Sequence, residues 1–224
     1  MTTGIASRLT PATAASSSSA TSKVPSPAVI VWLFGVSKNT DASLPYTERA
    51  IDNRGTILTN AGRLDEAKAD FDRVLSINPR FVNSLINRAT LLSAMQRWPE
   101  ALNDIDAAIA QGRPHARAFA LRCTILANLD RNAEALEDCT RALEGGWQRE
   151  LTWYWRGALL VRQGRHAEAL ADLDQALARN PKRGETHLQR GISLFALGRN
   201  NEALQAFDRA CELGYAPACG RSGR

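Results

Sequence analysis

A five-residue element, Arg-x-x-Glu-Ala, recurs at a constant interval and constrains the fold of this chain more than any other feature. Each step is 34 residues, since the element begins at Arg63, Arg97, Arg131, Arg165 and Arg199. A second arginine series keeps the same interval, at Arg54, Arg88, Arg122, Arg156 and Arg190. A fixed period of this length indicates an array of repeated supersecondary units. Repeat positions are counted below from Glu48, which is position 1 of the first repeat.

Each repeat is predicted to contain two helices. In the first repeat, Ile51, Gly55 and Leu58 share one helical stripe, and a second stripe runs from Ala67 to Leu75. Gly62 lies between the stripes, where it would end the first helix. Small residues recur at positions 8 and 20, where two antiparallel helices joined by a short turn can approach closely. The predicted structural positions are Gly55, Ala67, Phe71, Ala101, Ala135, Gly157, Ala169, Gly191, Ala203 and Phe207.

This pattern resembles the tetratricopeptide repeat, a helix-turn-helix unit of the same length. The resemblance covers residues 48 to about 215 and implies an all-α, right-handed superhelical solenoid of antiparallel helix pairs. The expected repeats are 48–81, 82–115, 116–149, 150–183 and 184–217, with a tail at 218–224. The main departures lie in the third repeat, where Gly145, Gly146 and Trp147 stand in place of the closing proline. We therefore expect the weakest junction between repeats three and four.

The second arginine series has a matching acidic series. Repeats one to four carry Arg at position 7 and Asp at position 23, which predicts an ion pair between the two helices of each repeat. The fifth repeat has Ala206 at position 23, so Arg190 is expected to be freer. In the Arg-x-x-Glu element, the glutamate sits at a helix start and can pair with the arginine three residues before it. A phosphate-binding arginine ladder is therefore the less favoured interpretation.

The first 47 residues differ from the repeats. Residues 1–27 are rich in Ser, Thr, Ala and Pro, a composition that predicts disorder. Residues 28–36, AVIVWLFGV, are apolar but too few to span a bilayer. This segment has the length of a signal-peptide core, and the acid-poor, Ser-rich start of the chain with Arg8 also fits a transit peptide, but a cap on the first repeat is favoured. We therefore expect residues 28–47 to form an N-terminal cap and linker.

Four cysteines allow two interpretations. Cys123 and Cys139 stand at packing positions of the third repeat, and we expect them to be buried free thiols. Cys211 and Cys219 are eight residues apart, a spacing that a turn could close into a disulfide in an oxidising compartment. Whether they do so is left open. The four are too scattered to indicate a zinc site.

The sequence contains no motif that points to catalysis, a cofactor or a metal. It lacks a nucleophile elbow, a phosphate-binding glycine loop and a His-Glu-x-x-His helix. The net charge of +5 is spread over structural positions, without the basic block and interleaved aromatics of a nucleic-acid site. We therefore expect a protein that is not an enzyme, with a protein or peptide partner, no nucleic acid and no membrane span.

In the family that this chain resembles, positions 2, 5, 9, 12 and 13 line a concave groove that receives a peptide or helix. The resemblance thus implies ligand-binding residues in the last two repeats: Leu151, Tyr154, Val161, Arg162, Glu185, Leu188, Ile192 and Phe195. We expect binding to centre on Tyr154, Leu188, Ile192 and Phe195. Family members that clamp chaperone C-termini carry Lys and Asn where the first repeat has Asp52 and Thr56, so that function is disfavoured.

The predicted function is a non-catalytic protein-interaction adaptor, cytoplasmic or alternatively exported to the cell envelope. Its 24 Arg against 4 Lys favour a bacterial source with a GC-rich genome. Alternatives are a recognition arm or companion of a larger repeat-bearing enzyme, such as a glycosyltransferase, and a self-assembling structural protein. The C-terminal end is expected to lack a full cap, which leaves Leu204, Phe207 and Cys211 partly bare and favours a homo-oligomer through this end.

Overall fold

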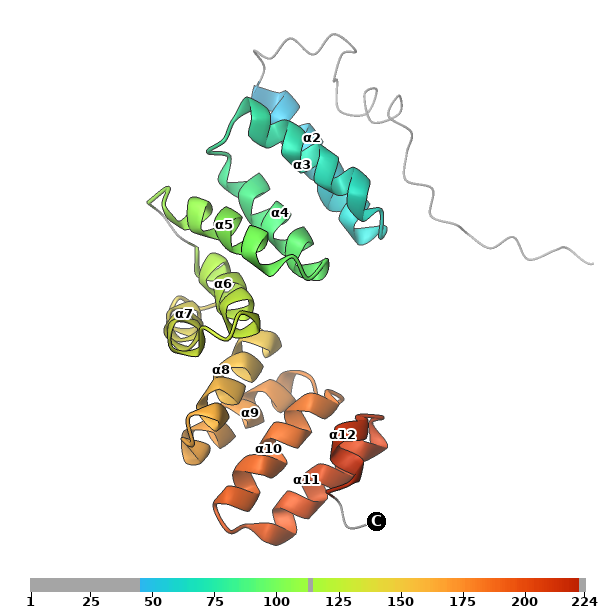
Figure 1. Ribbon diagram of the computed structural model, residues 1–224, viewed down its shortest axis with the longest axis vertical. Coiled ribbons are helices and arrows are strands. Elements are labelled where there is room, and N and C mark those ends of the chain that lie inside the picture. Colours follow the sequence, from blue (N-terminus) through green and yellow to red (C-terminus); the bar gives the residue numbers. More distant parts are fainter. Residues whose placement is uncertain (1–44, 113–114, 222–224) are drawn as a thin grey trace, which may run out of the picture.

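The chain folds into an elongated array of helix pairs (Figure 1). The structure, a computed structural model, describes residues 45–112 and 115–221. Within these ranges the chain forms helices and turns, without a strand. The all-α solenoid expected from the repeat spacing is confirmed. The segment expected to be disordered, 1–27, and the apolar segment 28–36 lie outside the described residues.

The helix pairs follow the 34-residue interval. The first helices of the five repeats are α2 (Pro45–Asn60), α4 (Val82–Ala94), α6 (Ala116–Asn128), α8 (Glu150–Arg162) and α10 (Gly184–Ala196). The second helices are α3 (Leu64–Ile77), α5 (Trp98–Ile109), α7 (Asn132–Glu144), α9 (His166–Arg179) and α11 (Asn200–Glu212). A short helix, α12 (Ala216–Cys219), follows and packs on α11.

The turn inside each repeat places position 15 in the left-handed region of backbone space. Gly62, Gly164 and Gly198 have φ values of 75°, 74° and 75° there. Gln96 and Asp130 hold the same position with φ values of 59° and 57°. Glycine adopts this conformation at no steric cost, whereas other residues do so less often. The departure at Gln96 therefore leaves the turn geometry unchanged.

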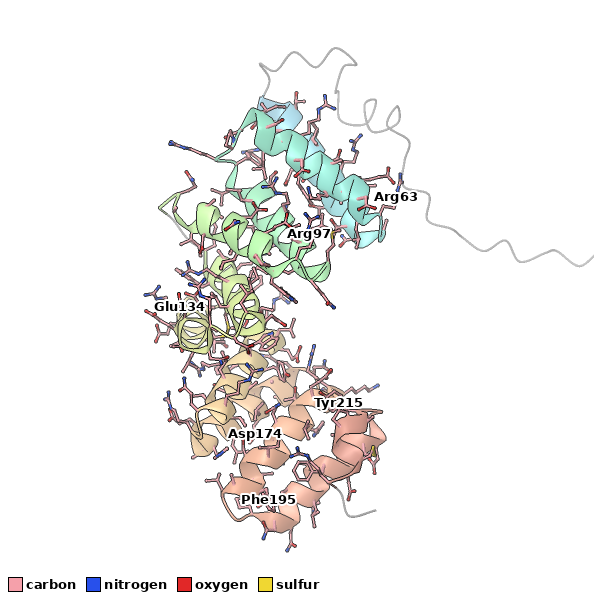
Figure 2. The ribbon with its side chains drawn as sticks, viewed as in Figure 1. Arg63, Arg97, Glu134, Asp174, Phe195 and Tyr215 are labelled. Atoms are coloured by element: carbon pink, nitrogen blue, oxygen red, sulfur yellow. A yellow bond between two sulfur atoms is a disulfide. The ribbon has the colours of Figure 1, made fainter. Side chains whose placement is uncertain are left out.

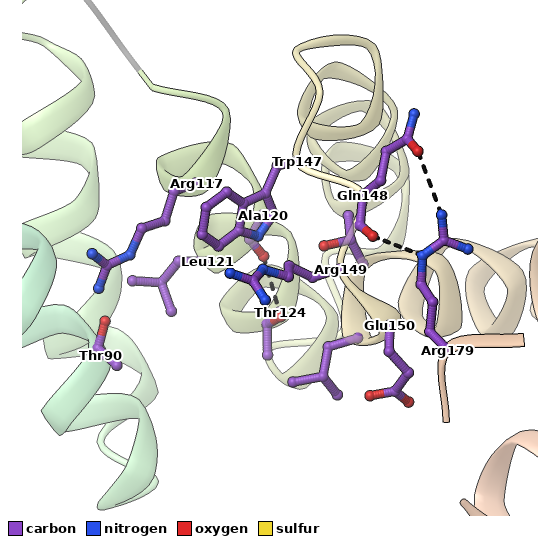
Figure 3. A pocket seen from close by; sticks show the side chains of 12 residues that line it. Thr90, Arg117, Ala120, Leu121, Thr124, Trp147, Gln148, Arg149, Glu150 and Arg179 are labelled. Carbon is purple, nitrogen blue, oxygen red and sulfur yellow. Dashed lines mark hydrogen bonds between the residues drawn. The ribbon is translucent and has the colours of Figure 1, made fainter. Parts of the chain in front are cut away.

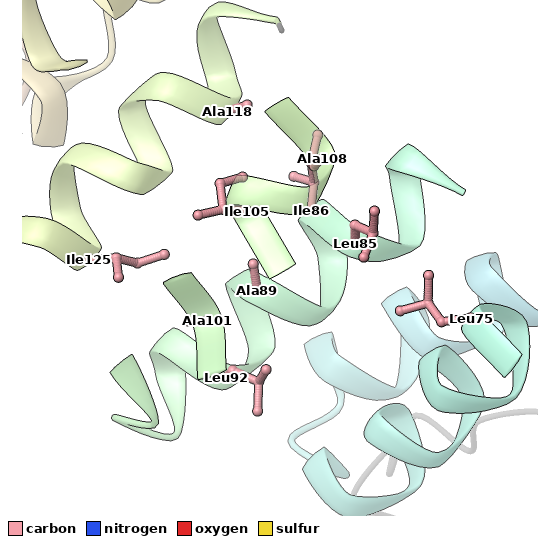
Figure 4. Packing of buried hydrophobic residues seen from close by; sticks show 10 residues of the cluster. All are labelled: Leu75, Leu85, Ile86, Ala89, Leu92, Ala101, Ile105, Ala108, Ala118 and Ile125. Carbon is pink, nitrogen blue, oxygen red and sulfur yellow. The ribbon is translucent and has the colours of Figure 1, made fainter. Parts of the chain in front are cut away.

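The two helices of a repeat touch where position 8 meets position 24. A Cβ atom at Gly55 would lie 2.7 Å from the ring of Phe71, and one at Gly157 would lie 2.9 Å from Leu173. Both large side chains are fully buried. In the second repeat, Ala89 and Ile105 take these positions within a cluster that runs from α3 to α6 (Figure 4). The small residue thus allows the close helix approach that buries its large partner.

Gly191 gives a direct test of this contact. A Cβ atom there would collide with the ring of Phe207, which is 5% exposed. We expect Gly191→Val to destabilise the protein by about 1–3 kcal/mol, the usual cost of overpacking a core. The matched control is Ala196→Val, which adds the same side chain at an exposed position of α10. Urea unfolding followed by circular dichroism measures both, and equal losses would contradict this account of position 8.

The third repeat fills the same contact with a disulfide. Cys123 and Cys139 occupy positions 8 and 24, their Cα atoms are 5.3 Å apart, and their sulfurs are bonded. Both residues are fully buried. The expectation of two free thiols is therefore wrong. Two cysteines at facing positions lie within the 4.4–6.8 Å Cα separation that a disulfide needs.

The junction between repeats three and four differs from the prediction as well. Gly146 has a φ of 85°, and the amide of Trp147 donates to the carbonyl of Ala142 at 2.9 Å, which closes the end of α7. A Cβ atom on Gly145 would lie 2.7 Å from that of Ala116 in α6. Both glycines thus serve a helix-ending turn and a close packing contact. The predicted penalty for glycine inside a helix does not apply here.

The arginines at position 7 bind the acids at position 23, as the spacing predicts. Arg88 donates to both carboxylate oxygens of Asp104 at 2.7 and 2.6 Å, and Arg156 does the same to Asp172 at 2.7 Å. Arg54 pairs with Asp70 and Arg122 with Asp138 in the same way. These four aspartates are buried. Every one of them is paired, as buried charges need to be.

The same arginines also connect neighbouring repeats, which the sequence interpretation missed. Nη1 of Arg88 donates to Asp72 at 2.7 Å and Nη1 of Arg122 to Asp106 at 2.8 Å. Arg190, expected to be freer, instead donates to Asp174 at 2.7 Å. In each case the acid is at position 25 of the preceding repeat. The arginine at position 7 therefore joins helices within a repeat and between repeats.

These bonds shift the titration of the groups. The hydrogen bonds to Asp104 raise the pKa of the Arg88 guanidinium, and those to Asp138 raise the pKa of Arg122. Partial burial opposes ionisation of Asp72, but hydrogen bonds from Lys68 and Arg88 outweigh it and lower the pKa of this carboxyl. The hydrogen-bonded carboxylates thus favour the charged form of the Arg88 and Arg122 guanidinium groups.

The C-terminal end carries a partial cap. Helix α12 packs on α11, Ala218 is fully buried, and Cys219 is bonded to Cys211. Phe207, expected to be partly bare, is 5% exposed, whereas Leu204 remains 44% exposed. The expectation of a bare end is thus wrong for Phe207 and correct for Leu204. The disulfide left open by the sequence is formed in this structure.

Candidate functional site

A pocket lies along the first helices of repeats two, three and four (Figure 3). Its volume is about 650 Å³. We call it the central pocket, and its lining residues are Thr90, Arg117, Ala120, Leu121, Thr124, Trp147, Gln148, Arg149, Glu150, Leu151, Thr152 and Arg179. The turn between α7 and α8 supplies Trp147, Gln148 and Arg149. The unusual Gly-Gly-Trp junction therefore shapes one wall of the pocket.

Two exposed arginines give the central pocket a positive charge. Arg149 lies over the Trp147 ring, with 5.2 Å from its guanidinium carbon to the ring centre. Arg117 approaches the side-chain oxygen of Asn87 at 3.4 Å. Among the residues that the structure describes, no carboxylate forms an ion pair with either arginine. Both guanidinium groups are thus available to an acidic ligand.

The one acidic residue that lines the central pocket is neutralised. The carboxylate of Glu150 pairs with Arg183 at 2.5 Å, and the side chain of Glu150 is 17% exposed. Arg179 is held in place, since it donates to the backbone oxygen of Gln148 at 2.8 Å and to Gln175. The pocket therefore presents positive charge beside apolar surface from Trp147 and from Leu151, which is 45% exposed.

The predicted groove residues of repeat four lie in different surroundings. Leu151 lines the central pocket. Tyr154 is half-buried, with its ring centre 5.3 Å from that of Trp155 and the guanidinium of Arg183 5.5 Å from its own ring centre. Burial raises the pKa of the Tyr154 hydroxyl, and the carboxylate of Glu185 raises it further. Val161 packs against the cluster around Leu173, and Arg162 donates to Asn132 at 2.9 Å.

In repeat five the prediction is wrong for Leu188. This residue is 8% exposed and belongs to the core cluster with Leu170 and Leu194. Position 5 is buried in most repeats, as Asp52, Ile86 and Ala120 also show. Leu188 packs with Leu170 of the preceding repeat, so little of its side chain remains on the surface. Leu188 is therefore not part of the candidate site.

The other predicted anchors of repeat five meet in a second pocket. Ile192 and Phe195 line a space of about 570 Å³ at the C-terminal end of the array, the end pocket, with Asn200, Ala203, Leu204, Phe207 and Arg221. Phe195 is 65% exposed and labelled in Figure 2. Leu151 and Tyr154 are not among its lining residues. The single groove predicted across repeats four and five is therefore divided between two places.

The predicted site residues did not include Trp147 and Arg149, which line the central pocket. In the sequence, Trp147 stands in place of the closing proline of the third repeat. The sequence did contain a signal, because an aromatic residue and a basic residue two positions apart replaced the usual residues of a turn.

Within the described part of the chain, no cluster of three His, Cys, Asp or Glu side chains suits a metal ion. The same part contains no helix with the length and apolar character to cross a bilayer.

Comparisons with known proteins identify one family and one fold. Family models described as "Tetratricopeptide repeat" match residues 40–81, 86–150 and 154–216. No curated protein matches this chain. The structure is similar to that of YrrB, described as a TPR protein with an unusual peptide-binding site, with a TM-score of 0.61 and 20% identity over 73% of this chain and 84% of that one. It is also similar to MamA, with a TM-score of 0.63 and 18% identity over 76% of this chain and 93% of that one. At this identity the likeness shows the fold alone.

Proposed function

The chain belongs to the tetratricopeptide repeat family, and on that premise we propose that it is an adaptor that binds an acidic, partly apolar peptide of a partner protein in the central pocket. The observation that carries this proposal is the pair of unpaired arginines, Arg117 and Arg149, beside the apolar surface of Trp147 and Leu151. Arginine binds carboxylates through two parallel hydrogen bonds, which gives both affinity and orientation.

The fold supports the peptide as the class of ligand. YrrB, which shares the fold, is described as having an unusual peptide-binding site. The central pocket spans the first helices of three successive repeats, so an extended segment can contact several of them at once. The polar side chains of Thr90, Thr124 and Gln148 can bond the backbone of such a segment. Association costs an estimated 4–15 kcal/mol, so a short peptide is expected to bind reversibly, with a micromolar Kd.

The two disulfides bear on the compartment. Structural disulfides form and persist in oxidising environments and are rare in the cytosol. The bonds Cys123–Cys139 and Cys211–Cys219 therefore favour export to the cell envelope over the cytoplasmic location that the sequence first suggested. A companion role for a larger enzyme is compatible with the same pocket, because such a partner would also present a peptide segment.

The proposal predicts a charge-dependent selection of peptides. Selection of a random peptide library on the full chain is expected to enrich sequences with Asp or Glu next to large apolar residues. Reversal of the two arginines, Arg117→Glu with Arg149→Glu, is expected to weaken a selected peptide at least tenfold, which is about 1.4 kcal/mol. Fluorescence anisotropy with the labelled peptide measures this change.

The matched control makes the same change of charge elsewhere. Arg80→Glu with Lys182→Glu reverses two exposed residues outside the central pocket. This variant is expected to bind nearly as well as the parent protein. If both variants lose affinity equally, the effect comes from net charge and the site is assigned wrongly. Enrichment of basic or purely apolar peptides would contradict the proposed ligand class.

A further inference from the structure

The N-terminal face of the array exposes a side chain that every other repeat buries. At position 10, Leu91, Ile125, Leu159 and Ser193 are at most 1% exposed, whereas Ile57 is 41% exposed. The buried residues insert into the preceding repeat, as Leu91 does in a cluster with Leu58, Ala67 and Phe71. In the described part of the chain, no repeat precedes α2. Among the described residues, Ile57 therefore lacks the preceding repeat into which its equivalents insert.

The C-terminal face has the complementary socket. Leu159 packs against Ala135 and Cys139, which stand at positions 20 and 24 of the preceding repeat. In the fifth repeat the same two positions are Ala203 and Phe207, and both line the end pocket. Leu204 in this pocket is 44% exposed, while its equivalent Leu170 is 8% exposed beneath α10. The end pocket is thus the site where a following first helix would insert.

The charges on the two faces also match. At three junctions an acid at position 25 accepts a hydrogen bond from the position 7 arginine of the next repeat. Position 25 of the last repeat is Asp208, and position 7 of the first is Arg54. Arg54 donates hydrogen bonds through Nε and Nη2 to Asp70 of its own repeat. Arg88 donates through the same two atoms to Asp104, and its Nη1 donates to Asp72 of the preceding repeat.

Helix α12 occupies part of this socket. By the repeat count, Ala218 stands at position 1 of a sixth unit, so α12 coincides with the first turn of its first helix. In α2 the corresponding turn is residues 46–49. The bond between Cys211 and Cys219 fastens α12 to α11. An incoming α2 can therefore take the full array register only when α12 is released.

We propose that copies of this chain associate head to tail, with Ile57 and Arg54 of one copy docked on the end pocket and Asp208 of the next, and that the Cys211–Cys219 disulfide restrains this association by holding α12 in the site. The occupant is a second copy because the apolar and charged residues on the two end faces match those that join successive repeats within the chain. This contact uses surfaces outside the central pocket and does not depend on peptide binding.

Removal of the Cys211–Cys219 disulfide, which frees α12, tests the proposal. In the full chain, Cys211→Ser with Cys219→Ser removes this disulfide and leaves Cys123–Cys139 intact. Sedimentation equilibrium is expected to show at least tenfold tighter association than for the parent. The mass is expected to rise beyond a dimer with concentration, because a head-to-tail contact leaves a free face at each end. A monomer at all concentrations in the unlocked variant would overturn the proposal.

Complementation then distinguishes head-to-tail from end-to-end contact. In the unlocked background, Ile57→Asp removes the inserting apolar side chain and Leu204→Asp damages the socket, both at exposed positions. Each variant alone is expected to be monomeric, with unchanged helical circular dichroism. Their mixture is expected to form a dimer that does not grow, since each supplies the face that the other lacks. If Ile57→Asp still associates like its parent, the contact joins two C-terminal ends and the head-to-tail arrangement is wrong.

Discussion

Replacement of Arg122 by methionine is expected to destabilise the protein by about 3 kcal/mol, at the low end of the usual cost of removing one partner of a buried ion pair, because Arg141 remains 4.0 Å from Asp138. Asp138 is 2% exposed and accepts two hydrogen bonds from Arg122, at 2.6 and 3.0 Å. Methionine keeps much of the apolar stem but supplies no donor. The variant also loses the bond to Asp106, which joins the third repeat to the second. Both the repeat and its junction are therefore weakened.

Two further variants show whether the loss comes from the uncompensated charge. Arg131→Met removes an arginine whose partner, Glu134, has a side chain that is 57% exposed, and exposed pairs contribute only about 0–1 kcal/mol. Arg122→Met with Asp138→Leu removes both buried charges, and such replacements are often neutral or stabilising. Urea denaturation of the three variants gives the comparison. If Arg131→Met costs as much as Arg122→Met, the position 7 arginines have no special role.

The sequence predicted the interactions inside a repeat better than those between repeats. Positions 7 and 23 lie on the two helices of one hairpin, so their pairing followed from antiparallel packing alone. The bond from Arg190 to Asp174 crosses a junction, and its geometry depends on how successive repeats are rotated. That rotation is a property of stacking, which no single repeat encodes. The expectation of a freer Arg190 failed for this reason.

The candidate site was harder to predict than the fold for a related reason. The groove positions were transferred from the family, but Leu188 at position 5 is buried because it packs with Leu170 of the preceding repeat. The central pocket instead depends on Trp147 and Arg149, which come from a turn. Turns vary among repeats while helix positions recur, so a periodic pattern carries little information about them. Phe195 is exposed at the C-terminal end of the described array, where it lines the end pocket.

The disulfide in the third repeat leads to the second large effect. Cys123→Ser with Cys139→Ser is expected to cost about 3 kcal/mol from the lost cross-link of a loop of this length, since the two cysteines are 16 residues apart. Two buried hydroxyl groups add a further cost of about 1–3 kcal/mol for each one that lacks a partner. The total is a large share of the 5–15 kcal/mol that stabilises a typical protein.

The first repeat suggests a pair of residues that can replace Cys123 and Cys139 without a disulfide. Cys123→Gly with Cys139→Phe recreates the pair that Gly55 and Phe71 form in the first repeat, where the small residue accepts the ring. This variant is expected to recover the packing and to lose only the contribution of the cross-link. It should therefore be more stable than the double serine variant. Equal stability would mean that the third repeat cannot accommodate the ring.

Reduction measures the contribution of the Cys123–Cys139 disulfide to stability separately from the contribution of side-chain packing. In a background with Cys211→Ser and Cys219→Ser, reduction is expected to lower the urea stability of the protein by about 3 kcal/mol, because only the cross-link is removed. In the same background, the variant with Cys123→Gly and Cys139→Phe has no disulfide, so a reductant is expected to leave its stability unchanged. If reduction leaves the parent unchanged as well, Cys123 and Cys139 act in solution as two packed thiols, which is what their repeat positions alone had suggested. The contact between positions 8 and 24 would then be stabilised by shape in all five repeats, and the case for an oxidising compartment would rest on Cys211 and Cys219.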